Sequence, residues 1–195
     1  MKKLLIAAAI AATTFAPQAF AQAKNFEGFS VLGGLNVASS KLDFEPAPGS
    51  AANSSDKTAT NAVLQAEYDI ALGNSFVLGL GVSAGLGDLS FGEPRNSTGE
   101  VKLKDHVSAY VAPGFALSNS ALIYGKLASI SATAGASTST SISGMGYGIG
   151  ARFLAGKNVF YQVEYLYNKY DDKGSNTGTT KLQSGALSFG VGYKF

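Results

Sequence analysis

The chain contains no cysteine, which excludes a disulfide framework, a thiolate metal site and a lipid anchor on an amino-terminal cysteine. Charged residues are also few. They make up 14% of the 195 residues, against roughly 25% in an ordinary soluble domain. After the amino-terminal segment, no window approaches the ~20 consecutive apolar residues of a membrane-spanning helix. The composition therefore indicates apolar surroundings without the pattern of a helical membrane protein.

The chain also lacks a large excess of positive or negative charge. The chain has 15 basic and 13 acidic residues, and Lys2 and Lys3 lie in a segment that we expect to be removed, which leaves 13 of each. No basic cluster is present, and a nucleic-acid-binding protein needs one to replace the counterions of phosphates. We therefore expect no nucleic-acid partner.

The first 21 residues have the pattern of a signal peptide. Two lysines precede an apolar run from Leu4 to about Ala16, and Ala19-Phe20-Ala21 matches an A-x-A cleavage site. We predict cleavage after Ala21 and export across the inner membrane. Residues 22–195 are then expected to form one domain.

The mature chain alternates apolar and polar residues with period two, which is typical of β-strands. In one segment Leu64, Ala66 and Tyr68 alternate with Gln65, Glu67 and Asp69. Eight such segments are predicted: 26–37, 58–72, 76–86, 101–117, 121–130, 142–154, 159–170 and 185–195. Strands this long are unusual in soluble sheets but suit a tilted bilayer crossing, which needs about 9–11 residues.

The connections alternate between short and long. "LGNS", "SNS" and "AGKN" are tight turns, whereas the other four connections are long, polar and rich in Ser, Thr, Asn and Gly. Transmembrane β-barrels sort their turns in this way.

Transmembrane β-barrels also carry aromatic girdles at the membrane interface. Eight aromatic residues are predicted outside at the short-turn end: Phe29, Tyr68, Phe76, Phe115, Phe153, Tyr161, Tyr193 and Phe195. A thinner belt, Tyr165 and Tyr167, is expected at the other end.

We therefore predict an all-β fold, an eight-stranded antiparallel up-and-down transmembrane β-barrel with its apolar side chains facing lipid. The first and eighth strands must pair, because hydrocarbon offers no partner to an open edge. The same alternation places Leu103 on the lipid face and Lys104, His106 and Ser108 in the lumen.

Four charged residues are predicted to form a network in the lumen: Glu67, Lys126, Arg152 and Glu164. An eight-stranded barrel is just wide enough for side chains to fill it, and buried charges are normally paired. An internal ion-pair plug is the first interpretation. A narrow, gated ion path is the alternative.

Three stretches resemble the OmpA/OmpX-type family of eight-stranded outer-membrane β-barrels: the closing "GALSFGVGYKF", "YVAPGFAL" (110–117) and "VFYQVEYLY" (159–167). The resemblance covers the whole mature chain and implies the cell outer membrane as its location. It also implies that the closing strand, with Tyr193 and Phe195, is the signal read by the outer-membrane insertion machinery. It does not extend to the peptidoglycan-binding domain that often follows such barrels, so a cell-wall-anchoring role is not expected.

Two patterns suggest chemistry but lack the context for it. His106 and Ser108 have the spacing of the His/Ser couple of outer-membrane lipid A deacylases, yet they lie on the lumen face and no Asp or Glu occurs between Asp105 and Glu164 to orient the imidazole. The glycines of "GMGYGIGA" continue a strand, whereas a phosphate-binding loop needs a turn into a helix. We expect no catalytic residues, no cofactor and no metal.

The expected function is a structural or surface-interaction role in the envelope. The partners would be outer-membrane lipid, the insertion machinery and an external ligand or host surface met by the long loops. A small low-conductance porin is the alternative. A deacylase-type envelope enzyme and a secreted lipocalin-like barrel, which would turn its apolar face inward, are further alternatives.

Overall fold

The computed structural model describes residues 22–46, 53–92, 101–135, 140–175 and 178–195. The predicted signal peptide, residues 1–21, lies outside these ranges. Within them, no helix is long and apolar enough to cross a membrane.

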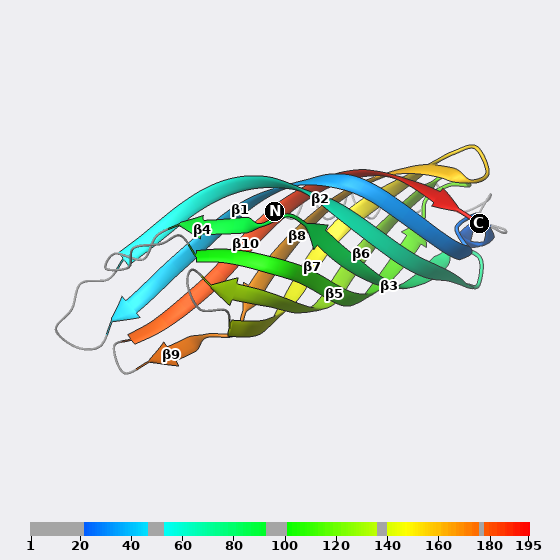
Figure 1. Cartoon of the computed structure of the whole chain (residues 1–195). Coiled ribbons are helices and arrows are strands. Elements are labelled where there is room, and N and C mark those ends of the chain that lie inside the picture. The colour runs from blue at the N-terminus through cyan, green and yellow to red at the C-terminus, as the bar shows by residue number, and fades with distance from the viewer. Residues whose placement is uncertain (1–21, 47–52, 93–100, 136–139, 176–177) are drawn as a thin grey trace, which may run out of the picture.

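Eight long strands form the wall of a barrel (Figure 1): β1 (Gly28–Pro46), β2 (Asn53–Leu72), β3 (Phe76–Leu86), β5 (Val101–Ala116), β6 (Ala121–Gly135), β7 (Thr140–Ala155), β8 (Val159–Tyr170) and β10 (Gly178–Lys194). Each pairs antiparallel with its neighbours in sequence, and β1 pairs with β10 from Ser30↔Lys194 to Pro46↔Gly178. This closure confirms the predicted architecture. Two short strands extend the wall: β4 (Leu89–Gly92) pairs with β5, and β9 (Lys173–Ser175) pairs with β10.

The large apolar side chains point outward, as predicted. Phe189 is 55% exposed and Leu80 43%, whereas Glu67 and Lys126 are 6% and 3% exposed. All eight aromatic residues of the predicted girdle are exposed at the short-turn end. The middle of the barrel is therefore apolar on its outer wall and polar within, the arrangement that lipid requires.

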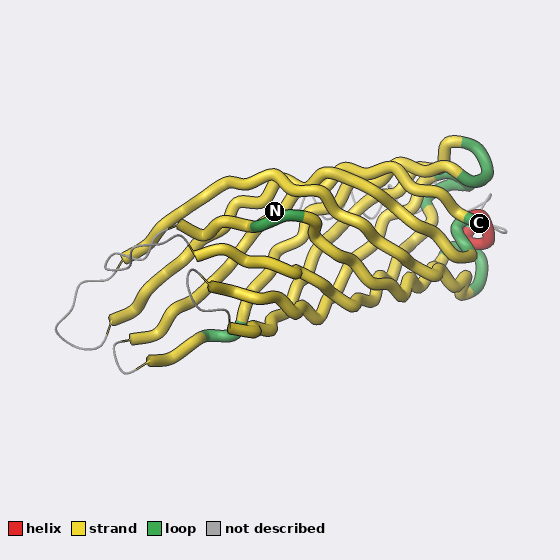
Figure 2. Tube along the Cα trace, in the orientation of Figure 1, coloured by secondary structure: helices red, strands yellow, loops and turns green. Residues whose placement is uncertain are grey.

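Four strands run much further than the sequence analysis predicted. β1 has 19 residues and β2 has 20, although a tilted crossing needs about 9–11. Residues 38–46 and 53–57, interpreted as loop, are paired strand, and β6 and β10 likewise extend into predicted loop. Much of the sequence interpreted as loop is thus paired strand, and these strands lengthen the barrel at the end away from the carboxyl terminus (Figure 2).

The polarity of the wall reverses in these extensions. On β6, Ser129 and Ser131 are exposed, while Ile130 and Ala132 are buried. β1 repeats the pattern with Lys41 outside and Leu42 inside. The interior at this end is an apolar core of Leu42, Leu103, Ile130, Ile142, Tyr170 and Leu182. The extension is therefore folded as a water-exposed barrel with a largely apolar interior, which we call the outer barrel.

One predicted orientation is wrong. Leu103 is fully buried and Lys104 is exposed, the reverse of the prediction. The register between β5 and β6 shifts between Lys104 and Val107, and Asp105 has a φ of 50°. The extra residue of such a bulge inverts the alternation beyond it, which brings Leu103 into the core of the outer barrel.

The amino-terminal residues close the opposite end. The predicted strand at 26–37 begins at Gly28, and the residues before it form a 3-10 turn, η1 (Ala23–Asn25). The Ala23 N–H donates to the carbonyl of Asn74 at 3.0 Å, and the Asn25 amide donates to the carbonyl of Asn119 at 3.2 Å. These contacts hold Phe26, which is 1% exposed, beneath the short-turn end of the barrel.

Candidate functional site: the filled lumen

Arg152 on β7 is the centre of the larger charge cluster in the lumen. Its two terminal nitrogens each contact a carboxylate at 2.6 Å, Nη2 on Glu67 and Nη1 on Asp69. Nε and Nη2 also donate to Oε1 of Gln162 at 3.1 and 2.9 Å. The guanidinium carbon lies 4.5 Å from the centre of the Phe160 ring. The fork of Arg152 thus joins β2 to β7 and β8 across the barrel.

Lys126 on β6 forms the second cluster. Its Nζ lies 2.6 Å from Oε2 of Glu164 and 3.9 Å from the centre of the Tyr110 ring, a cation–π contact. The hydroxyl of Tyr124 donates to the same Glu164 oxygen at 2.8 Å. Both charged side chains are 3% exposed, so removing either one would leave the other charge buried without a counter-ion.

Two glutamines connect the clusters. Nε2 of Gln162 donates to Oε1 of Gln65 at 3.1 Å, and the Tyr110 hydroxyl donates to that oxygen at 3.5 Å. Because Tyr110 also contacts Lys126, the two charge clusters form one network across five strands. The network spans the middle of the lumen.

One glycine of "GMGYGIGA", Gly150, makes room for this network. The ring of Tyr124 lies against Gly150 so closely that a Cβ atom at that position would overlap it. A side chain there would displace Tyr124 from Glu164. The glycine series thus serves packing, and its strand, β7, continues straight through it.

Apolar layers lie on both sides of the charges. The core of the outer barrel is on one side, and on the short-turn side are side chains that are at most 2% exposed: Ala23, Phe26, Val77, Ala116, Leu122 and Phe160. An ion crossing the lumen would meet a largely apolar layer, a layer of paired charges with one surplus carboxylate, and a second apolar layer.

All four predicted network residues lie in the lumen, as two pairs: Glu67 with Arg152 and Lys126 with Glu164. Asp69 is on the polar face of its predicted strand but outside the predicted network, and the structure adds it to the Arg152 cluster. The roles of Gln65, Gln162, Tyr110 and Tyr124 were missed. Alternation could place them inside, but their partners depend on a register across strands that one sequence does not give.

His106 and Ser108 have different neighbours in the structure. The Ser108 hydroxyl is hydrogen-bonded to that of Ser83 at 2.8 Å, and Nε2 of His106 has no hydrogen-bond partner among the described residues. The His106 ring instead packs edge-on against Tyr170, with centroids 6.4 Å apart. In the part of the chain that the structure describes, no three His, Asp or Glu side chains gather as metal ligands would.

The residues of the predicted assembly signal lie together on the outer wall. The rings of Tyr193 and Phe195 meet edge to face at 5.1 Å, and Phe195 also lies 5.8 Å from Phe29. The Phe195 N–H donates to the carbonyl of Phe29 at 2.9 Å. The carboxyl-terminal aromatic is thus fixed to β1 at the closing seam and is 70% exposed.

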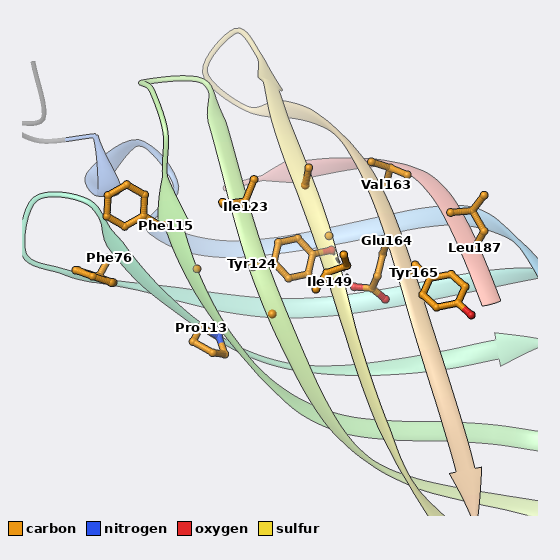
Figure 3. A pocket seen from close by; sticks show the side chains of 14 residues that line it. Phe76, Pro113, Phe115, Ile123, Tyr124, Ile149, Val163, Glu164, Tyr165 and Leu187 are labelled. Carbon is orange, nitrogen blue, oxygen red and sulfur yellow. Dashed lines mark hydrogen bonds between the residues drawn. The ribbon is translucent and has the colours of Figure 1, made fainter. Parts of the chain in front are cut away.

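The outer wall also carries an apolar groove of about 760 Å³ (Figure 3). Outward side chains of several strands line it, among them Phe115, Ile123, Ile149 and Val163. Tyr124 and Glu164 reach its floor from the lumen side, next to Gly150. Since this face of the barrel meets lipid, acyl chains are the expected contents of the groove.

Comparison with solved structures supports the same architecture. The structure is similar to Ail of Yersinia pestis in complex with sucrose octasulfate (TM-score 0.52, 19% identity, 87% of this chain and 99% of that chain). It is also similar to Neisserial surface protein A (0.54, 18%, 87% and 98%) and to OprG of Pseudomonas aeruginosa (0.51, 15%, 87% and 96%). At these identities the likeness concerns the fold. No curated protein sequence matches the chain.

The family comparison covers nearly the whole sequence. The model of the outer membrane protein beta-barrel domain matches residues 5–195. Together with the closed eight-stranded barrel and its apolar outer wall, this match gives the location as well as the fold. The chain belongs to the outer membrane protein β-barrel family and is an integral protein of the outer membrane.

Proposed function

We propose that this protein is a closed, non-enzymatic barrel that contributes to envelope integrity and presents its outer barrel to a partner outside the cell. The observation that carries the proposal is the filled lumen. Both charge clusters are internally neutralised except for one surplus carboxylate, and apolar layers cover them on both sides. Moving an ion through a largely apolar layer is costly, so the small-porin alternative is disfavoured.

The outer barrel supports a role at the surface. Paired strands hold its exposed face, including Ser129, Ser131 and Lys169, in fixed positions. A rigid surface loses less conformational entropy on binding than mobile loops do. Ail, whose fold this chain shares, was solved with the heparin analogue sucrose octasulfate, which illustrates that such a barrel can carry an external ligand.

Conductance in a planar bilayer tests the closed state. The purified barrel should show no single-channel events above the lipid leak, and Lys126→Ala or Glu164→Ala should create events or leave the barrel less stable. Well-resolved openings in the unmodified protein would refute the closed-barrel proposal.

Gene deletion tests the biological role. Loss of the protein should raise envelope permeability or lower adhesion to an external surface, and the two assays separate the structural role from the interaction role. His106→Ala should leave both unchanged. Deacylation of lipid A by the purified barrel that is lost in this variant would instead establish the enzyme.

Export is proposed to end with cleavage after Ala21. The mature chain would then begin at Gln22, directly before η1, so that the new terminus lies at the short-turn end of the barrel. The intact mass of protein extracted from outer membranes tests this site, and a mass retaining residues 1–21 would exclude it.

A further inference from the structure

Two lysines flank a glutamine at the base of the outer barrel. Lys41 on β1 is paired in register with Gln183 on β10, which is paired in turn with Lys169 on β8. Alternation directs all three outward, and both lysines are exposed. Since neighbouring strands are about 4.8 Å apart, the Cα atoms of the two lysines are about 10 Å apart. This is close enough for both side chains to reach over Gln183.

Aromatic side chains mark the level of this row relative to the membrane. The next outward row contains Tyr167 and Tyr147, whose ring centroids are 5.2 Å apart. Below it, Tyr165 lies beside Leu187, and both are exposed. Tyrosine rings favour the membrane interface, so the row of Lys41, Gln183 and Lys169 lies at the height of the lipid headgroups.

A groove of about 410 Å³ connects these levels. Its lining includes Lys41, Thr58 and Gln183 at the polar end and Val37, Tyr165 and Leu187 at the apolar end. Gly185 lies between the two ends, and a Cβ atom there would be 2.6 Å from the Tyr165 hydroxyl. The groove therefore has the polarity of an amphiphile, with its polar end away from the hydrocarbon.

Gln183 is oriented for an anion. Its Oε1 accepts a hydrogen bond from the Tyr167 hydroxyl at 2.5 Å, which leaves the amide nitrogen to donate. The amide nitrogen of Gln183 and the ammonium groups of the two lysines together form a set of hydrogen-bond donors, which a phosphate requires.

Acidic neighbours weaken the positive field and must be included. Lys41 Nζ lies 3.0 Å from Oδ2 of Asp43, and Asp56 is opposite Lys41 on β2. Asp43 follows Lys41 on the side away from the bilayer, and the Lys41 side chain remains 51% exposed. Asp43 therefore competes with a ligand for Lys41 without blocking the groove.

We propose that this face of β8, β10 and β1 binds a phosphorylated glycolipid of the outer leaflet. The phosphate lies between Lys41 and Lys169 and accepts from Gln183, and an acyl chain follows Val37 and Leu187. The site is separate from the lumen. Its failure would therefore leave the closed-barrel proposal untouched, and open channels would leave the lipid site untouched.

Native mass spectrometry of the detergent-solubilised mature protein tests the site with bisphosphorylated lipid A as the probe. The double variant Lys41→Ala/Lys169→Ala should bind lipid A about 25-fold more weakly, from about fivefold for each lysine near an anionic headgroup. Lys102→Ala/Lys104→Ala is the matched control. It removes two lysines from β5, across the barrel at the same end, and should change the affinity less than twofold.

Further variants and probes test which chemical groups of the ligand are recognised. Asp43→Ala frees Lys41 and should tighten binding several-fold, whereas phosphatidylcholine should bind equally to all variants and inorganic phosphate should not displace lipid A. Unchanged affinity in the Lys41/Lys169 variant, an equal loss in the Lys102/Lys104 control, or weaker binding by Asp43→Ala would each overturn the proposal. Each protein is first shown to be folded by its heat-modifiable gel mobility.

Discussion

Replacing Arg152 by methionine tests whether the lumen network stabilises the barrel. Methionine keeps the length of the buried side chain but removes the contacts to Glu67 and Asp69 at 2.6 Å and the hydrogen bonds to Gln162. Two carboxylates on the same face of β2 then lose their cation in a site where they are 6% and 2% exposed.

The expected loss is large because the partners stay behind. Removing one member of a buried ion pair typically costs about 3–5 kcal/mol, which is a factor of roughly 10² to 10³ or more in the folding equilibrium. The triple variant Arg152→Met/Glu67→Gln/Asp69→Asn removes all three charges. It should regain most of this free energy, since neutral replacement of a buried ionic cluster is often close to neutral in stability.

Denaturant unfolding of the barrel in lipid vesicles measures both effects. The chain has no tryptophan, so circular dichroism and the gel shift of the folded form are suitable signals. Lys157→Met, an exposed lysine in the turn after β7, is the control and should change the free energy of unfolding by no more than about 0.5 kcal/mol. An Arg152→Met barrel as stable as this control, or a triple variant no better than the single, would refute the reasoning.

Three further outcomes are expected. Gly150→Val should displace Tyr124 from Glu164 and lower stability by about 1–3 kcal/mol, measured by the same unfolding assay, whereas an unchanged midpoint would contradict the packing role. Asp105→Gly should be tolerated and Asp105→Val should cost about 1–2 kcal/mol, because the bulge holds this residue at a φ of 50°; the opposite order would exclude backbone strain as the cause. Deleting Phe195 should reduce the amount of folded protein in the outer membrane, scored by the heat-modifiable band, and normal assembly would end the proposed signal role.

The alternation of apolar and polar residues was sufficient to predict the membrane-spanning strands of the barrel. Strands β3 and β8 have the predicted bounds, because a lipid-facing strand must place apolar side chains at every second position. The same rule placed Glu67, Lys126, Arg152 and Glu164 inside. It could not show that Arg152 reaches Asp69, since that contact joins residues 83 positions apart through a register set by the closed barrel.

The outer barrel was missed for a different reason. Ser129, Ile130 and Ser131 alternate as regularly as the membrane segment does, but with the apolar residue on the opposite face. A lipid-facing phase alone predicts the strand only to residue 130, so residues 131–135, which continue it in water, are interpreted as loop. The bulge at Asp105 leaves no comparable trace, because Leu103 and Val107 share a parity in the sequence and point to opposite faces in the structure.

The reversal of polarity also determines how deep the protein is immersed. Sliding the barrel inward would bring Ser129, Ser131 and Lys41 into hydrocarbon, and sliding it outward would expose the aromatic girdle, so its height along the membrane normal has one favoured value. The eight residues from Ser39 to Pro46 then extend β1 by roughly 19–22 Å along the membrane normal, at about 3.3 Å per residue and a 35–45° tilt. A peptide tag grafted directly after β1 would begin at a known distance from the cell surface, within reach of an antibody that cannot approach the bilayer itself.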